Sequence, residues 1–180
     1  MRNDYFLKMK GTTQSPPRVN LPEIVWSWVG SFLGIAAIAF LDECFCSGTE
    51  LILIIAPSGA SAVLVFGAIR SPLAQPRNLL GGQILSALIG VSAYKLLPSH
   101  IWLAAALAVA TAIAIMHATK TLHPPGGATA LIAVIGGAQI HSLGYLYALL
   151  PIGAGAAIML VVGLLVNNIP RTRRYPEFWF

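Results

Sequence analysis

Uncharged stretches alternate with short charged ones along this chain. Four uncharged runs are clear, at 24–41, 51–69, 78–94 and 96–119. An ionisable side chain at the bilayer centre costs at least about 2.5–3.5 kcal/mol on insertion scales, so we interpret each uncharged run as a membrane element. Their lengths are close to the roughly 20 residues that one spanning helix needs. The pattern therefore predicts an all-α, polytopic membrane protein.

The last uncharged run, 121–170, has 50 residues and is long enough to cross the bilayer twice. Gly136-Gly137 and the stretch from Gln139 to Gly144 supply a break within it. We therefore expect a short element near 125–137 and a full span near 145–168. This makes six membrane elements in total.

Lysine and arginine in short loops collect on the cytoplasmic side of a membrane, and this rule predicts the orientation. If the N-terminus lies inside, six crossings place ten of the eleven basic residues inside and only Lys95 outside. Both termini are then cytoplasmic. The predicted parts are an N-terminal tail at 1–21, a transmembrane domain at 22–168 and a short basic C-terminal tail at 169–180.

The composition excludes a soluble enzyme, because 57% of the residues are hydrophobic and only 9% are charged. The net charge of +5 comes from residues that flank apolar runs, so we expect the lipid bilayer as a partner and no nucleic acid. Metalloprotease, CxxC, phosphate-loop and nucleophile-elbow motifs do not occur, and no pair of intramembrane carboxylates exists. We expect no enzymatic activity, metal or cofactor.

Two segments share an internal pattern of proline, any residue, glycine, alanine, hydroxyl residue and alanine, at an offset of 68 residues. The repeat divides the chain into halves of three elements each, about 22–97 and 101–168, with the second half inverted. Inverted repeats with interrupted helices in matching positions indicate a transporter or channel site at the bilayer midplane. The first copy begins Pro57, Ser58, Gly59, Ala60, Ser61, and the second Pro125, Gly126, Gly127, Ala128, Thr129.

Proline suits the first turn of a helix because it has no N–H, so each copy predicts a helix that begins in mid-membrane. Elements two and five would then be broken or half-length helices with facing N-termini. Each N-terminus carries about half a positive charge and amide donors, which the glycines leave open to a small anion. Hydroxyls of Ser58, Ser61 and Thr129 would add donors. The alternative is that both motifs are tight helix-packing sites.

Two histidines flank the entrance to the fifth element. His117 and His123 can titrate near neutral pH, so either could couple anion binding to a proton, while the alternative is a neutral ring that caps a backbone carbonyl. Arg77 and Asn78 stand where the chain re-enters the membrane from inside. Arg77 would attract anions to this cytoplasmic mouth, or would serve only as a topology anchor.

Small residues spaced four apart let helices approach closely. Gly30 and Gly34 form such a pair in the first span, and Gly153 and Ala157 form one in the last. We interpret both pairs as packing within one subunit. A homo-oligomer interface through these small-residue helix faces is the alternative.

The chain resembles the HPP family of integral membrane proteins, which is named for a tripeptide. The matching residues are His123-Pro124-Pro125 with Gly126 to Leu131, the loop Ser71 to Asn78 with Gly81-Gly82, and Gly59 to Leu64 with Phe66-Gly67. The resemblance implies a bacterial inner membrane, including that of cyanobacteria, or a plastid envelope. It also implies nitrite transport, because some members are described as nitrite transporters.

These observations together predict a transporter or channel for a small inorganic anion, most readily nitrite. The predicted substrate site comprises the two repeat copies and His123-Pro124. A passive channel for small neutral solutes is one alternative, since aquaporins also join two half-helices at the midplane. A non-transporting membrane scaffold is another, suggested by the small-residue helix faces.

Overall fold

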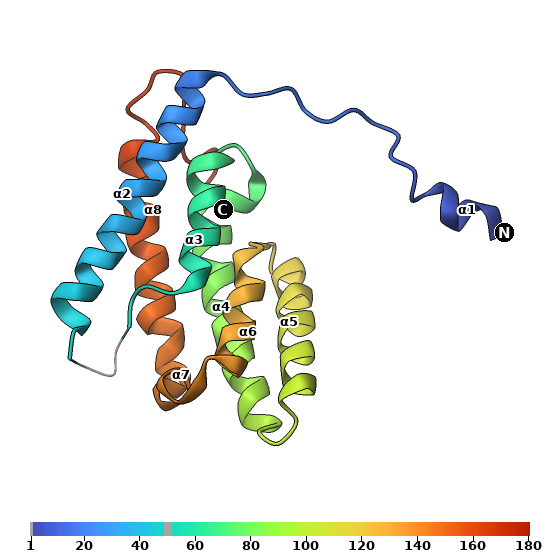
Figure 1. The fold of residues 1–180 in the computed structure, drawn as a ribbon, viewed down its shortest axis with the longest axis vertical. Coiled ribbons are helices and arrows are strands. Elements are labelled where there is room, and N and C mark those ends of the chain that lie inside the picture. The colour runs from blue at the N-terminus through green and yellow to red at the C-terminus, as the bar shows by residue number, and fades with distance from the viewer. Residues whose placement is uncertain (1, 49–51) are drawn as a thin grey trace.

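The computed structural model describes residues 2–48 and 52–180, which form helices and connecting loops without a strand among them (Figure 1). Helix α1 (Arg2–Leu7) lies far from the bundle, at the end of an extended N-terminal tail. Within the described residues, four helical segments are long and apolar enough to cross a membrane: Leu21–Cys46, Pro76–Leu96, Ile101–Ala118 and Gly137–Val166. This confirms the prediction of an all-α polytopic membrane protein.

The first of these segments is helix α2 (Leu21–Cys46), which lies along one side of the bundle and packs against α8 (Figure 1). Its start is fixed by Asn20, whose side chain accepts a hydrogen bond of 3.0 Å from the backbone N–H of Glu23. Such a cap satisfies one of the amides that a helix N-terminus leaves without a partner.

Two shorter apolar helices begin at the prolines of the repeat. Helix α3 (Ala56–Ala62) has Pro57 in its first turn and continues as a π-helical turn through Val63–Gly67. Helix α6 (Pro125–Ile135) begins at the proline itself. The predicted helix starts are therefore confirmed. Figure 1 shows that both helices begin near mid-height of the bundle and run toward opposite ends.

Helices α4 (Pro76–Leu96), α5 (Ile101–Ala118) and α6 pack closely against one another. Small residues make this possible, since α5 turns a buried row of Ala104, Ala108 and Ala112 toward the bundle. A Cβ on Gly90 of α4 would lie 2.5 Å from the Ala130 carbonyl oxygen of α6. Only glycine allows that approach.

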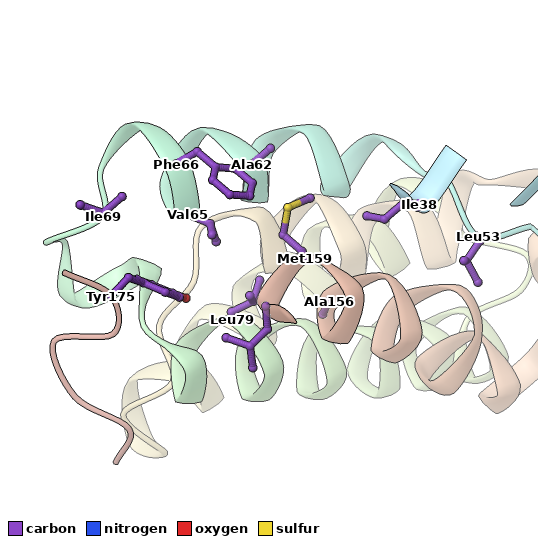
Figure 2. Packing of buried hydrophobic residues seen from close by; sticks show 11 residues of the cluster. Ile38, Leu53, Ala62, Val65, Phe66, Ile69, Leu79, Ala156, Met159 and Tyr175 are labelled. Carbon is purple, nitrogen blue, oxygen red and sulfur yellow. The ribbon is translucent and has the colours of Figure 1, made fainter. Parts of the chain in front are cut away.

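The small-residue face of α2 is used inside the subunit. A Cβ on Gly30 or Gly34 would overlap the ring of Phe66, which follows α3 in the chain. Figure 2 shows Phe66 and Met159 in the apolar cluster that joins α2, α3 and α8. The Gly30 and Gly34 pair therefore packs within one chain, as preferred above, and this face is not left open for the homo-oligomer alternative.

The last segment differs from the predicted span near 145–168. After α7 (Gly137–Leu143) come a 3₁₀ turn, Gly144–Ala148, and an irregular stretch, Leu149–Gly153, and regular helix α8 covers only Ala154–Val166. The cause is Pro151, which disfavours helical backbone at the residue before it, and Leu150 has φ −128° and ψ 119°. Tyr147, Ala148 and Ile152 are buried, as irregular backbone at membrane depth requires.

The segment after α8 folds back over the end of the bundle where α2 begins (Figure 1). The Arg173 side chain is 1% exposed and forms an ion pair of 2.7 Å with Glu23 of α2. The Tyr175 hydroxyl donates to the Ala74 carbonyl at 2.8 Å, and burial raises the pKa of this phenol. Arg173, which belongs to the predicted basic tail at 169–180, is therefore buried and helps to hold the fold together.

Candidate functional site

Four polar side chains lie buried together where α3, α4 and α6 meet. Their exposed fractions are 2% for Ser61, 4% for Gln83 and 0% for both His123 and Thr129. Polar groups inside a membrane bundle are costly unless they are hydrogen-bonded, and they commonly mark functional positions. We call these four residues the polar chain.

Hydrogen bonds fix the state of the imidazole in the polar chain. His123 Nδ1 lies 2.8 Å from the Leu73 carbonyl oxygen, which can only accept, so Nδ1 carries the hydrogen. In a neutral ring the other nitrogen is then an acceptor. His123 Nε2 accordingly accepts from the Ser61 hydroxyl at 2.9 Å.

Gln83 of α4 joins the two copies of the repeat. Its Nε2 donates to Ser61 Oγ at 2.8 Å, and its Oε1 accepts from the Thr129 hydroxyl. The hydrogen bonds therefore run in one direction, from Thr129 through Gln83 and Ser61 to His123. Tyr147 holds the Thr129 end of the polar chain, because its hydroxyl donates to the Thr129 carbonyl at 3.1 Å.

Close packing of α4 against α6 brings these groups together. A Cβ on Gly82 would lie 2.6 Å from the His123 Cβ, and one on Gly126 would lie 2.6 Å from Ser86 Oγ and 2.9 Å from the Gly82 carbonyl. Both glycines therefore act as packing residues. For Gly126 this favours the helix-packing alternative over a direct contact with substrate.

The expected free amides at the helix N-termini are occupied. The N–H of Gly126 donates to the His123 carbonyl at 2.8 Å, and that of Gly127 to the Pro124 carbonyl at 3.0 Å. On α3, the Ser58 N–H donates to the Ile55 carbonyl at 2.9 Å. The expectation that the glycines of α6 leave backbone donors open is therefore wrong for this conformation, because the chain closes its own first turn.

A cavity of about 10 Å³ adjoins the polar chain. Ser58, Ser61 and Gln83 supply its polar lining, and Gly155 and Met159 of α8 lie on its apolar side. A space of this size has room for about one water molecule. The hydroxyls and the amide thus face a space of about one water molecule, not a wide pore.

The remaining predicted residues divide between the interior and the surface. Ser61 and His123 contact each other in the polar chain, and Thr129 is joined to them through Gln83. Pro57, Ser58 and Pro125 are buried nearby. The exposed positions are Gly59, Ala60 and Pro124, while Gly127 and Ala128 are half-buried.

A family model for the HPP transmembrane region matches residues 16–176, which is most of the chain. The chain belongs to the HPP family. It is therefore an integral, multi-pass membrane protein, and the family predicted from the tripeptide and its neighbouring motifs is confirmed.

Two curated proteins of Dictyostelium discoideum, both described as transmembrane proteins, are similar to this HPP-family chain. One is 47% identical over 179 residues, covering 98% of this chain and 57% of the relative. The other is 43% identical over 181 residues, covering 98% of this chain and 63% of the relative. The chain thus spans about three fifths of these relatives. They are eukaryotic and lend no support to a bacterial origin. No solved structure matches the chain.

At the predicted mouth of this HPP-family chain, Asn78 donates from Nδ2 to the Leu122 carbonyl at 2.9 Å and so ties α4 to the loop before α6. Among the described residues, Asn78 Oδ1 and Arg77 Nε are buried side-chain atoms without a hydrogen-bond partner. His117 is exposed on α5 and takes no part in the polar chain. Of the two predicted histidines, only His123 lies at the site.

Gln83 and Tyr147 belong to the site but lie outside the repeated pattern. Gln83 is 22 residues from Ser61 and 46 from Thr129, so no short spacing connects them. The available signal was an amide side chain in the middle of an uncharged run, since such a group needs a partner inside the membrane. Tyr147 sits close to Pro151, where the sequence predicted a regular span.

Proposed function

We propose that this HPP-family protein transports a small inorganic anion, with nitrite as the substrate. The observation that carries the proposal is the polar chain, which joins Ser61 of one repeat copy to Thr129 of the other through Gln83. A membrane bundle does not need such a chain for stability alone, because apolar side chains would fill the same space at lower cost.

We further propose that the chain is a three-plus-three inverted repeat of six membrane elements. Helices α3 and α6 are the second and fifth elements, each begins at a repeat proline, and they run in opposite directions (Figure 1). In transporters built this way, the substrate binds between the interrupted helices near the midplane. The polar chain lies between these two helices.

The donors around the cavity suit an oxyanion. The Ser58 hydroxyl and the second N–H of the Gln83 amide are available as donors, and no carboxylate is among the lining residues to repel a negative charge. The occupied amides at the start of α6 leave recognition to these side chains. A small anion is favoured over a bulky metabolite because the cavity is small.

The direction of the hydrogen bonds supports proton coupling at His123. When His123 gains a proton at Nε2, that nitrogen becomes a donor to Ser61 Oγ, which already accepts from Gln83. The Ser61 hydroxyl must then turn its own hydrogen elsewhere, and the cavity that it lines is the available space. One proton thus adds a positive charge and a donor beside the cavity at once.

The size of the cavity favours a gated transporter over a continuously open pore for neutral solutes. With room for about one water, an anion enters only when the surrounding helices separate. The passive channel and the membrane scaffold are the outcomes against which the proposal is tested.

The test is nitrite uptake into proteoliposomes that hold the purified chain, with and without an inward proton gradient. Protein-free vesicles correct for leakage of nitrous acid, and water and glycerol permeability is measured in parallel. We expect protein-dependent uptake that rises with the gradient. It should fall at least tenfold in His123→Ala and Gln83→Ala, since each removes a link of the polar chain.

His100→Ala is the matched control, because His100 is exposed at the start of α5 and forms no side-chain cap. Its uptake should equal that of the unsubstituted protein. Equal uptake by all variants would remove the polar chain from the mechanism. Fast water or glycerol passage without nitrite uptake would support the neutral-solute channel, and no protein-dependent flux of any solute would support the scaffold.

A further inference from the structure

An arginine-lined groove lies at the end of the bundle where α2 begins. It consists of two adjoining hollows of about 620 and 570 Å³, which share Arg70, Thr172 and Arg173. The first hollow also contains Arg18 and Glu23. The second is lined in addition by Arg171, Arg174 and Glu177.

The groove carries uncompensated positive charge. Arg173 is paired with Glu23 at 2.7 Å, so these two charges cancel. The side chains of Arg18, Arg70, Arg171 and Arg174 are exposed, and no ion pair or hydrogen bond joins them to the described residues. With Glu177 as the one further acid in the lining, the groove keeps a surplus of three positive charges.

The wall between the hollows is rigidly held. The Arg173 guanidinium donates to the Glu23 carbonyl at 3.0 Å, to Ser27 Oγ at 2.7 Å and to Asn167 Oδ1 at 3.0 Å. The backbone that carries Arg171, Thr172 and Arg174 is therefore anchored to α2 and α8. A ligand for the neighbouring arginines meets a groove that is largely preformed.

Helix α2, which supplies Glu23 to the groove, carries an exposed apolar surface on its opposite face. Leu21, Val25 and Trp28 in the first turns of α2 are 70%, 49% and 66% exposed. Further along the helix, Trp28 and Phe32 stack at 5.4 Å between ring centroids and line an apolar hollow of about 410 Å³. Since α2 is long and apolar enough to span a membrane and begins at the groove, we place the groove at headgroup level and the apolar residues further along α2 at the level of acyl chains.

We propose that the groove binds the headgroup phosphate of an anionic lipid, with Arg70 and Arg174 as its principal contacts and the acyl chains in the surrounding bilayer. Arginine suits a phosphate because its planar guanidinium donates two parallel hydrogen bonds. Basic pockets at the membrane surface are a recurrent form of anionic-lipid recognition. The position of the groove at the end of a candidate membrane span favours a lipid over a soluble phosphate, and the site is separate from the polar chain.

The test is native mass spectrometry of the purified full chain, titrated with phosphatidylglycerol or phosphatidylcholine in detergent. The unsubstituted protein should retain phosphatidylglycerol in preference to phosphatidylcholine. The double variant Arg70→Gln/Arg174→Gln should bind phosphatidylglycerol roughly thirtyfold more weakly, since each basic residue at a membrane surface contributes about five- to sixfold. Both side chains are exposed, so thermal unfolding should be unchanged.

Lys8→Gln/Lys95→Gln is the matched control, because it removes the same charge from exposed positions outside the groove. It should retain phosphatidylglycerol as the unsubstituted protein does. Equal retention of both lipids, or an unchanged affinity in the arginine variant, would overturn the proposal. Displacement of the lipid by millimolar inorganic phosphate would overturn the assignment to a lipid and identify a soluble anion as the ligand.

Discussion

The Thr129 hydroxyl shows how one buried side chain contributes to the stability of this bundle. It is fully buried, and its hydrogen bond to Gln83 Oε1 begins the polar chain. Thr129→Val keeps the shape but leaves the Gln83 oxygen buried without a donor. We expect a loss of about 1–3 kcal/mol in the free energy of unfolding, measured by thermal unfolding in detergent. Thr129→Ser should recover most of it, and equal losses in both variants would point to packing.

Gly82 tests the close contact between α4 and α6. The added methyl of Gly82→Ala would lie 2.6 Å from both the His123 Cβ and the Thr121 carbonyl oxygen. We expect a destabilisation of about 1–3 kcal/mol, visible as a lower melting temperature, because the backbone must shift. Gly59→Ala is the control, since nothing lies within 4 Å of its added Cβ. Equal melting temperatures would show that the contact is looser than described.

Three of the four residues of the polar chain could be predicted from the sequence, because they stand in or beside the repeat. Ser61, His123 and Thr129 lie in or beside a repeat that the sequence displays, and a hydroxyl or imidazole there stands out against apolar neighbours. Gln83 comes from a different helix, and its role depends on how α4 sits between α3 and α6. Whether the amides at Gly126 and Gly127 are free depends on the local turn, which the residue types alone do not decide.

Among the elements, the ion pair between Arg173 and Glu23 holds the C-terminal segment on α2. Arg173→Gln removes one partner of a largely buried pair and several hydrogen bonds. We expect a loss of about 2–4 kcal/mol in unfolding free energy, because Glu23, with a side chain 28% exposed, keeps part of its hydration. Lys8→Gln in the exposed N-terminal tail should leave the melting temperature unchanged. An equally stable Arg173→Gln protein would mean that the segment detaches in solution.

The elements were predictable where proline starts a helix and less so where it interrupts one. Pro57 and Pro125 fall in the first turns of α3 and α6, as the repeat predicted. Pro151 instead lies inside an apolar run, which hydropathy alone describes as one span. The irregular stretch there is stable because Tyr147 and its neighbours are buried, and burial is a tertiary property.

For the whole molecule, the predicted orientation can be tested with the two cysteines. Cys44 is exposed near the C-terminal end of α2, whereas Thr13 precedes the N-terminal end of this candidate membrane span. In intact cells, a membrane-impermeant maleimide should label Cys44 in a Cys46→Ser variant. It should label Thr13→Cys, in a chain without native cysteines, only after permeabilisation. The reverse result would place the N-terminus outside.

The C-terminal segment has a consequence for the histidine of the polar chain. Tyr175 donates to the Ala74 carbonyl, and the Glu177 N–H donates to Gln75 Oε1 at 2.8 Å. These bonds secure the loop whose Leu73 carbonyl orients His123. Hydrogen bonds thus connect the C-terminal segment to the imidazole of the polar chain. A displacement of Tyr175 would therefore be transmitted to His123 through Ala74 and Leu73, without passing through a membrane helix.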